Sequence, residues 1–230
     1  MGAGSATKGA STSADEETNR QSRGMEGGPS LNSLAIMRQA TTPTDISSVD
    51  INDWHCVVYE GNCFLVLPKA CEIAWGDEES CWSWITEKEK CFHSIVDIHV
   101  PESKKLSWLL IQGRFNTRAL SPNTMYEVTF VVKLIRTDFR WPSPVKLELD
   151  LPDGTKQTCT ERLTRKPREE WIKLHVGEFM MGSKNVGRIY FALHGTVDTE
   201  KSGLILRGVL IHPKDGAKHN QFDAVEHEFE

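Results

Sequence analysis

Apolar and polar residues alternate with a period of two in a series of short segments that begins near Trp54. The clearest of them, residues 124–135, places large apolar side chains at every second position of one face. This period is typical of a β-strand with one buried and one solvated face. The same reasoning predicts strands over residues 54–60, 63–68, 105–115, 145–151, 170–176, 187–194 and 204–213.

Turn-forming residues separate most of the predicted strands. Gly61-Asn62 predicts a hairpin between the first two segments, and Pro152-Asp153-Gly154 ends the strand that begins at residue 145. After residue 54, no segment keeps a helical apolar period for longer than about two turns. About eight to ten strands without helical crossovers predict an all-β chain, folded as an antiparallel β-sandwich of the jelly-roll kind.

The two ends of the chain differ in composition from its middle. Residues 1–50 contain no Phe, Trp or Tyr and are dominated by small, polar and charged residues. Such a segment cannot bury enough apolar surface to offset the entropy lost on ordering. We therefore predict a disordered N-terminal extension over 1–50, one folded domain over 51–214 and a polar C-terminal tail over 215–230.

Charge and hydropathy narrow the class of protein. The chain carries 27 Lys and Arg against 32 Asp and Glu, a formal net charge of -5. This balance argues against a dedicated nucleic-acid binder, which needs a clear cationic footprint. No apolar stretch is long enough to predict a membrane span, and the N-terminus lacks the apolar core of a secretory signal. We expect a cytoplasmic chain that does not bind membranes.

Motifs for catalysis and metal binding are absent from the sequence. The eight histidines match no metal-ligand spacing, no serine lies in a nucleophile elbow, and no Gly-rich phosphate loop occurs. Carboxylates are plentiful, but no pair can be assigned as general acid and general base. We expect a protein that is not an enzyme and that needs neither a cofactor nor a metal.

The six cysteines gather in one part of the chain, with five of them inside 36 residues at spacings that match no zinc template. We expect reduced thiols that act as small apolar residues in half-buried strands. Disulfides are the alternative if the protein enters an oxidising fluid, and Cys81 is the best candidate for an exposed thiol. The six are Cys56, Cys63, Cys71, Cys81, Cys91 and Cys159.

Three of the seven tryptophans, Trp75, Trp82 and Trp84, surround the charged segment 76–80. Alternation predicts one strand face for residues 71, 73 and 75, and a second shared face for Trp82 and Trp84. Trp84 is expected in the core, whereas Trp75 and Trp82 abut the charged turn, where burial on every side is difficult. An exposed ring beside carboxylates suits a sugar, whose C–H faces stack on aromatic rings while its hydroxyls seek acceptors.

Several ordered blocks of the sequence resemble the phloem protein 2 family of plants, which includes the tobacco agglutinin (Nictaba-like) lectins. They are NCFLVLPKACEIAWGDEESCWSWITEKE, LSWLLIQGRFNTRALSPNTMYEVTFVVKL, EEWIKLHVGEF and EKSGLILRGVLIHPK, which together span roughly residues 62–214. The hallmark blocks of the family match Ile73–Asp77 and Cys81–Trp84.

The resemblance implies a β-sandwich lectin without catalytic activity that binds N-acetylglucosamine oligomers, such as chitin fragments and N-glycan cores, in defence and wound sealing. It also implies the site. Two tryptophans stack on the sugar rings and a Lys-Ser pair near the C-terminus joins them. To these we add two neighbouring carboxylates, which we expect to accept hydrogen bonds from hydroxyls. The residues are Trp75, Trp82, Asp77, Glu200, Lys201 and Ser202.

Two positions depart from the family pattern, since Cys81 replaces a tyrosine and Glu200 replaces an aromatic residue. Each departure removes a stacking surface, while Glu200 can accept hydrogen bonds from hydroxyls. The sequence therefore leaves two functions open: a lectin, or a structural and RNA-binding phloem protein with a degenerate sugar site. A glycan-active enzyme is the third hypothesis, and turnover of chitin oligomers by the purified chain would support it.

The resemblance also implies a location and partners beyond the glycan. It places the chain in the cytoplasm of phloem sieve elements and companion cells. The basic segment 162–168 lies where the tobacco lectin carries a nuclear-import signal, so it allows nuclear entry and weak RNA binding, although a solvated loop explains it as well. Glycoproteins, a second copy of the chain, and a disulfide-linked phloem filament protein are the other partners that the resemblance allows.

Overall fold

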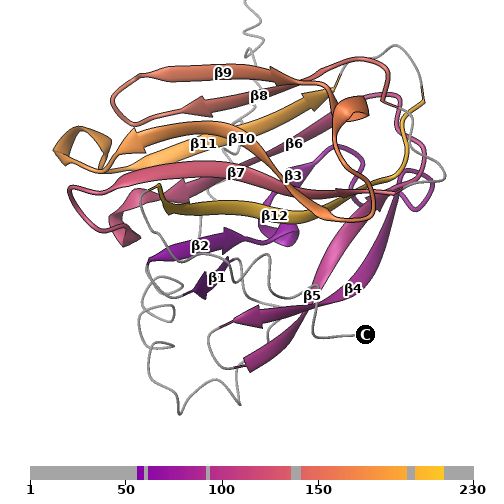
Figure 1. Ribbon diagram of the computed structural model, residues 1–230, viewed down its shortest axis with the longest axis horizontal. Coiled ribbons are helices and arrows are strands. Elements are labelled where there is room, and N and C mark those ends of the chain that lie inside the picture. Colours follow the sequence, from indigo (N-terminus) through magenta and orange to yellow (C-terminus); the bar gives the residue numbers. More distant parts are fainter. Residues whose placement is uncertain (1–55, 60–61, 92–93, 136–140, 196–199, 215–230) are drawn as a thin grey trace, which may run out of the picture.

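A computed structural model describes residues 56–59, 62–91, 94–135, 141–195 and 200–214. These residues form twelve β-strands and four short 3-10 helices. All strand pairings are antiparallel, and they build one sheet of seven strands and one of five (Figure 1). The antiparallel β-sandwich that alternation predicted is therefore confirmed.

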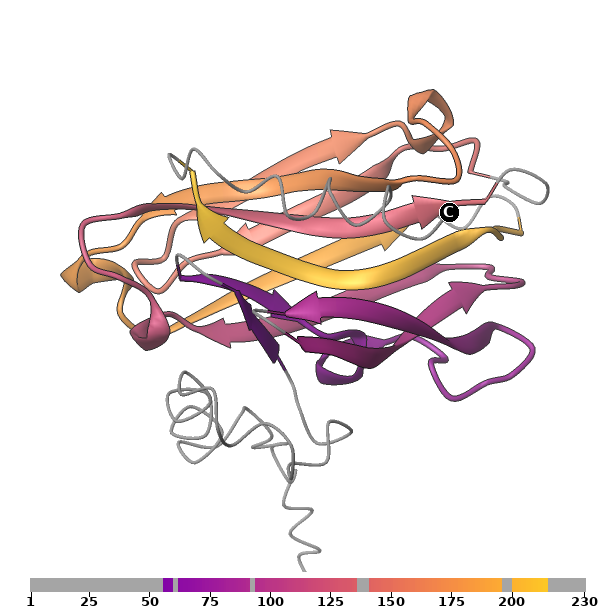
Figure 2. The same ribbon diagram turned by 60° about the horizontal axis from the view of Figure 1, so that its bottom comes forward.

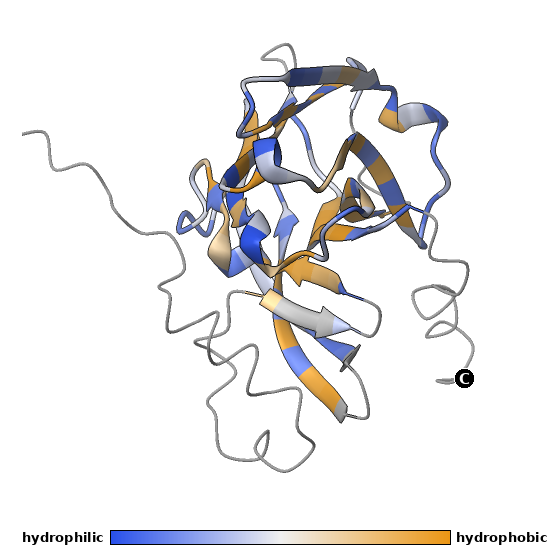
Figure 3. Cartoon of the chain, turned by 90° about the vertical axis from the view of Figure 1, so that its left-hand side faces the viewer, coloured by the Kyte–Doolittle hydropathy of each residue, from blue (hydrophilic) through white to orange (hydrophobic). Residues whose placement is uncertain are grey.

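The five-stranded sheet has the order β3-β6-β11-β8-β9. Its strands are β3 (Glu72–Ile73), β6 (Leu109–Asn116), β8 (Val145–Asp150), β9 (Lys156–Glu161) and β11 (Arg188–Gly195). Buried and more exposed positions alternate along β8 and β11, and Figure 3 shows hydrophobic and hydrophilic residues following one another along the strands. Ile111, Leu193 and Leu147 are paired neighbours and buried, so one face of this sheet covers the core and the other faces solvent.

The seven-stranded sheet follows the path β1-β2-β12-β5-β4, and β7 joins it between β12 and β10. Its strands are β1 (Cys56–Tyr59), β2 (Cys63–Val66), β4 (Trp82–Cys91), β5 (Ser94–Ser103), β7 (Met125–Leu134), β10 (Trp171–Met180) and β12 (Leu204–Pro213). In Figure 1, β4 and β5 form a long hairpin that extends away from the other strands. In Figure 2, β12 lies between β7 and the strands of the N-terminal part.

Four 3-10 helices connect the strands: η3 (Pro68–Ala70), η4 (Thr117–Ala119), η5 (Leu163–Arg165) and η6 (Ser183–Asn185). No helix in the described ranges is long and apolar enough to cross a membrane. Apart from β3, which has only two residues, the strands that no predicted range covers are β4, β5 and β9, although alternation predicted the shared strand face of Trp82 and Trp84 at the start of β4. The predicted segment 105–115 becomes a strand only from Leu109, and the predicted extension 1–50 and tail 215–230 lie outside the described residues.

Apolar side chains fill two regions on opposite faces of the seven-stranded sheet. The main core lies between the sheets, where Phe130 and Phe191 meet edge to face with ring centroids 6.0 Å apart. A smaller cluster includes Leu65, Ile98 and Leu210. Residues 204–211 of β12 are buried on both faces because the strand separates these regions, which explains why its sequence is a continuous apolar run.

A buried ion pair lies beside the smaller cluster. Arg207 donates from Nε to a carboxylate oxygen of Glu89 at 2.6 Å, and the Tyr59 hydroxyl donates to the other oxygen at 2.7 Å. Both charged side chains are almost fully buried. Burial, together with the negative charge of Glu89, raises the pKa of Tyr59 well above its ordinary value. The pair therefore links the β4–β5 hairpin to the central strand β12.

Candidate functional site

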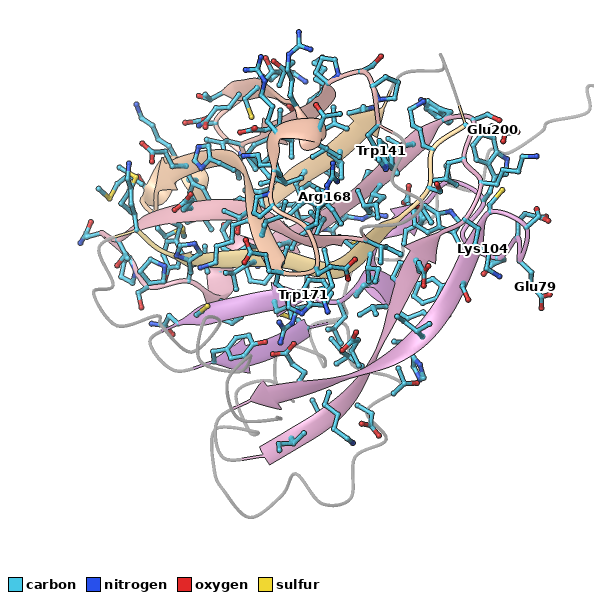
Figure 4. All side chains as sticks on the ribbon, turned by 45° about the vertical axis from the view of Figure 1, so that its right-hand side comes forward. Glu79, Lys104, Trp141, Arg168, Trp171 and Glu200 are labelled. Carbon is cyan, nitrogen blue, oxygen red and sulfur yellow. The ribbon has the colours of Figure 1, made fainter. Side chains whose placement is uncertain are left out.

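Three segments far apart in the sequence meet at one end of the sandwich: the turn 71–82, residues 103–108 and residues 200–203. The backbone N–H of Lys104 donates to the Cys81 carbonyl at 2.8 Å, and Leu106 exchanges two backbone hydrogen bonds with Lys201 at 2.8 and 2.9 Å. Figure 4 shows Glu79, Lys104 and Glu200 together at this end. The structure thus brings the two sequence blocks of the predicted sugar site into one region.

Trp82 and Trp84 hold the turn by their indole N–H groups. Trp82 donates to the Ala74 carbonyl at 3.0 Å, and Trp84 donates to the Gly76 carbonyl at 2.8 Å. Residues two apart on a strand point to the same side, so both rings of β4 reach the same turn. The turn backbone is therefore fixed by two tryptophans, which the sequence pattern did not reveal.

The expectation that Trp82 lies at the surface is wrong. Its side chain is only 2% exposed and belongs to the main core. A buried ring has no free face for a pyranose, so Trp82 supports the site from below. Trp84, which was expected in the core, is half-buried instead, and the ammonium of Lys69 lies 3.5 Å from the centroid of its ring.

Trp75 is the most exposed tryptophan of this cluster, with 45% of its surface open to solvent. It does not share a strand face with residues 71 and 73, because β3 ends at Ile73 and a turn follows. The Gly76 N–H donates to the Ile73 carbonyl at 3.0 Å, which places Trp75 third in this turn with a φ of 56°. Glycine or asparagine is usual at that position, so an indole there is under backbone strain. Its ring meets Trp108 edge to face, with centroids 5.9 Å apart.

A hollow of about 460 Å³ lies beside the turn, and we call it the turn hollow. Its lining combines the ring of Trp84, the ammonium of Lys69, two carboxylates and the amide of Gln112. This mixture suits a polar ligand with apolar faces. Asp77, a predicted site residue, is exposed and lines it. Its lining residues are Pro68, Lys69, Cys71, Glu72, Ile73, Ala74, Gly76, Asp77, Trp84, Leu110 and Gln112.

A second hollow of about 390 Å³, the loop hollow, contains two other predicted residues. Glu200 is exposed there and forms an ion pair with Lys105 at 2.9 Å. Ser202 is half-buried, and its carbonyl accepts a hydrogen bond from the Trp141 indole N–H at 2.9 Å. Lys201 is only 1% exposed and does not line this hollow, because alternation turns its side chain inward. The expected direct contact of Lys201 with a sugar is therefore not available in this structure.

The cysteines for which side chains are described are free thiols. Burial raises the pKa of Cys63 and of Cys71 to about 12, and it raises the pKa of Cys56 and Cys159 as well. Cys81 is half-buried against the main core rather than exposed. The side chain of Cys91 lies outside the described residues. No group of three or more His, Cys, Asp or Glu in the described ranges could hold a metal ion.

The basic segment 162–168 forms the short helix η5 and the loop after it. Arg162 and Arg165 are exposed, and Lys166 pairs with Glu161 at 3.0 Å. Burial lowers the pKa of Arg168. The segment is a largely solvated loop with part of its charge neutralised, as the sequence predicted.

Comparison with known proteins identifies the family. The family model described as Phloem protein 2 matches residues 61–213. Protein PHLOEM PROTEIN 2-LIKE A1 of Arabidopsis thaliana is 33% identical over 80% of this chain and 80% of its own length. Protein PHLOEM PROTEIN 2-LIKE A5 of the same plant is 38% identical over 67% of this chain but 38% of its own length. A protein of Luffa acutangula named Lectin is 33% identical over 67% of this chain and 72% of its own length. The chain belongs to the phloem protein 2 family.

Proposed function

We propose that this chain is a carbohydrate-binding lectin that recognises N-acetylglucosamine oligomers at the turn hollow. One observation supports the proposal above the others: the indole ring of Trp75 is held open to solvent at a strained turn position, and its chain neighbours Ala74 and Gly76 line the turn hollow. Strain of this kind is kept only where the surrounding structure imposes it, and it gathers at functional sites. The name of the Luffa acutangula relative points in the same direction.

In the proposed mode of binding, a pyranose ring lies against Trp75, while Asp77 and Glu72 accept hydrogen bonds from hydroxyls. Gln112 offers a side-chain amide to the acetamido group. Ring stacking adds about 0.5–1.5 kcal/mol beyond buried area, by analogy with aromatic pairs. One shallow site of this type supports dissociation constants in the millimolar to micromolar range, about -4 to -8 kcal/mol.

The loop hollow is the proposed second contact region of the glycan. Glu200 and Ser202 would meet hydroxyls there, beside Lys104 and Lys105. Lys201 would act indirectly, because its backbone ties this loop to Leu106. Trp82 likewise would act through the turn that it supports.

The second candidate function is a structural and RNA-binding phloem protein with a degenerate sugar site. The observation that favours it is the burial of Trp82 and Lys201, since two of the six predicted site residues offer no surface to a ligand. The exposed arginines Arg162 and Arg165 would then contact phosphates.

Chitotriose titration separates the two functions. Calorimetry and tryptophan fluorescence of the wild type are expected to give saturable binding, which Trp75→Ala weakens. Trp171→Phe is the matched control, because Trp171 lies on β10 under Lys133, away from both hollows. No response of the wild type to chitotriose, together with retention of RNA in gel-shift assays, would favour the second function instead.

The proposed biological role is glycan cross-linking in defence and wound sealing, in the cytoplasm of phloem cells and without turnover of the sugar. A homodimer that presents two sites would raise avidity by about 10²–10⁴. Sedimentation of the purified chain and agglutination of glycoprotein-coated beads test this role, and a monomer that agglutinates nothing would contradict it.

A further inference from the structure

The outer face of the five-stranded sheet carries a separate hollow of about 290 Å³, which we call the sheet groove. Its position follows from the register of three strands. Gln112 on β6 pairs with Ala192 on β11, which pairs with Glu148 on β8. Along β11, Tyr190 and His194 lie two residues to either side of Ala192 and so share its face. The small Ala192 therefore forms a floor, with larger side chains around it.

Tyr190 gives this groove an aromatic platform. Its side chain is 50% exposed, although it lies on β11, the central strand of the sheet. Its paired neighbours across the strands are Arg114 and Asp150. The ring of Tyr190 is thus half exposed at the centre of the sheet face, with polar groups on both sides. Such a ring can stack on a flat ligand with polar edges.

The charges of this face are balanced within it. Glu72 accepts from the Gln112 amide at 2.6 Å and lies 3.9 Å from Arg114. On the other side, Glu148 pairs with Lys146 and with His194, and the Lys146 hydrogen bond is the main cause that lowers the pKa of Glu148.

Asp150, farther along β8, pairs with Lys156 at 2.5 Å. Three carboxylates thus face three cations, so this surface neither attracts a polyanion nor forms a cation site. What it offers is a dense set of hydrogen-bond donors and acceptors around a ring. That chemistry fits an uncharged polyhydroxyl ligand.

The sheet groove adjoins the turn hollow. Glu72 and Gln112 line both. The combined surface crosses β3, β6, β11 and β8, which is three inter-strand steps, or about 14 Å at the usual spacing of strands. This length exceeds the size of one monosaccharide, so a ligand that starts at the turn can extend over Ala192 to Tyr190.

From the two shared lining residues, the balanced charges and the exposed ring, we infer that the sheet groove provides further subsites for an extended, uncharged oligosaccharide, with Tyr190 as the second stacking platform. The inference rests on the proposed function, because the first sugar residue is placed at Trp75. It goes beyond that function by predicting that the chain distinguishes long from short oligomers of the same sugar.

Calorimetry with chitin oligomers from the disaccharide to the hexasaccharide tests the inference. The wild type is expected to bind the hexasaccharide more tightly than the disaccharide. Tyr190→Ala should weaken hexasaccharide binding by about 2- to 12-fold and leave disaccharide binding unchanged. Tyr190→Phe, which keeps the ring, should retain most of the hexasaccharide affinity. Trp75→Ala should weaken both ligands.

Equal affinity of the wild type for all lengths, or hexasaccharide binding that Tyr190→Ala leaves intact, would overturn the sheet groove while the proposed function stands. If the wild type binds no oligomer of any length, the proposed function fails, and the groove as its extension fails with it. Circular dichroism and thermal unfolding of each variant show whether the fold is kept. An Ala192→Leu variant, which fills the floor of the groove, provides a second test and should reproduce the loss seen with Tyr190→Ala.

Discussion

Replacing Trp75 by glycine and by alanine separates the two roles of this residue, because both changes remove the indole ring and only glycine removes the backbone strain. Loss of the edge contact with Trp108 costs about 0.5–1.5 kcal/mol of unfolding free energy. A glycine adopts the left-handed conformation at φ 56° without strain, which raises the unfolding free energy by about 1–2 kcal/mol. Trp75→Gly should therefore lie between about 0.5 kcal/mol less stable and about 1.5 kcal/mol more stable than the wild type.

Trp75→Ala keeps the strain and loses the ring contact, so we expect it to be about 1 kcal/mol less stable than Trp75→Gly. In differential scanning calorimetry this difference corresponds to about 2–4 °C in Tm for a chain of this size. Both variants should lose chitotriose affinity to the same extent, about 2- to 12-fold. Asn123 is a matched control, since it is exposed with a φ of 55° at a different turn. Its glycine and alanine variants should differ in Tm and bind as the wild type does.

Three outcomes would refute this reasoning. Equal Tm values for Trp75→Gly and Trp75→Ala would mean that the turn does not impose the left-handed conformation on residue 75. Wild-type affinity in either variant would mean that the indole ring is not the stacking platform. A parallel loss of affinity in the Asn123 variants would show that turn stability, rather than the ring, controls binding.

Three further changes test other parts of the structure. Trp82→Phe removes the N–H that the Ala74 carbonyl accepts and should lower the unfolding free energy by about 1–3 kcal/mol, whereas an unchanged Tm would contradict its supporting role. Arg207→Met leaves Glu89 buried without its cation and should cost about 3–5 kcal/mol in urea titrations, and the double change with Glu89→Leu should recover most of it. For Cys63, burial raises the pKa from the ordinary 9.0 to about 12, so the thiol loses its proton at a lower pH in the unfolded chain than in the folded chain. Its contribution to stability is complete below pH 9 and is lost as the pH rises toward 12, and a Cys63→Ala chain with an equally steep alkaline loss would contradict this.

Alternation located most strands because they lie at the boundary between core and solvent. It missed β9 because the sequence KQTCTE carries no large apolar residue on either face, and its position at the edge of the five-stranded sheet requires none. In β4 it predicted only the shared face of Trp82 and Trp84 and missed the charged remainder, ITEKEKC, which pairs with β5 at the sheet edge. These segments form strands because they hydrogen-bond to a neighbouring strand, and no local sequence pattern indicates those hydrogen bonds.

The site shows the same limit at the level of single side chains. Alternation correctly placed Trp82 and Trp84 on one side, but their depth depends on segments distant in the sequence. Trp82 pairs with Ser103, beside the meeting point of residues 104–106 and 200–203, whereas Trp84 lies beside Lys69 of η3. The sheet groove requires the register of β6, β11 and β8, and it cannot be read from any one of them.

The position of β12 has a consequence for synthesis of the protein. This strand pairs with β2 and β7, and Leu210 lies opposite both Leu65 and Thr129. While residues 204–213 are still inside the ribosome, the edges of β2 and β7 have no partner, and apolar side chains meant for two clusters face water. We therefore expect the nascent chain to depend on chaperones until its last strand emerges, so that folding completes only after translation of this region.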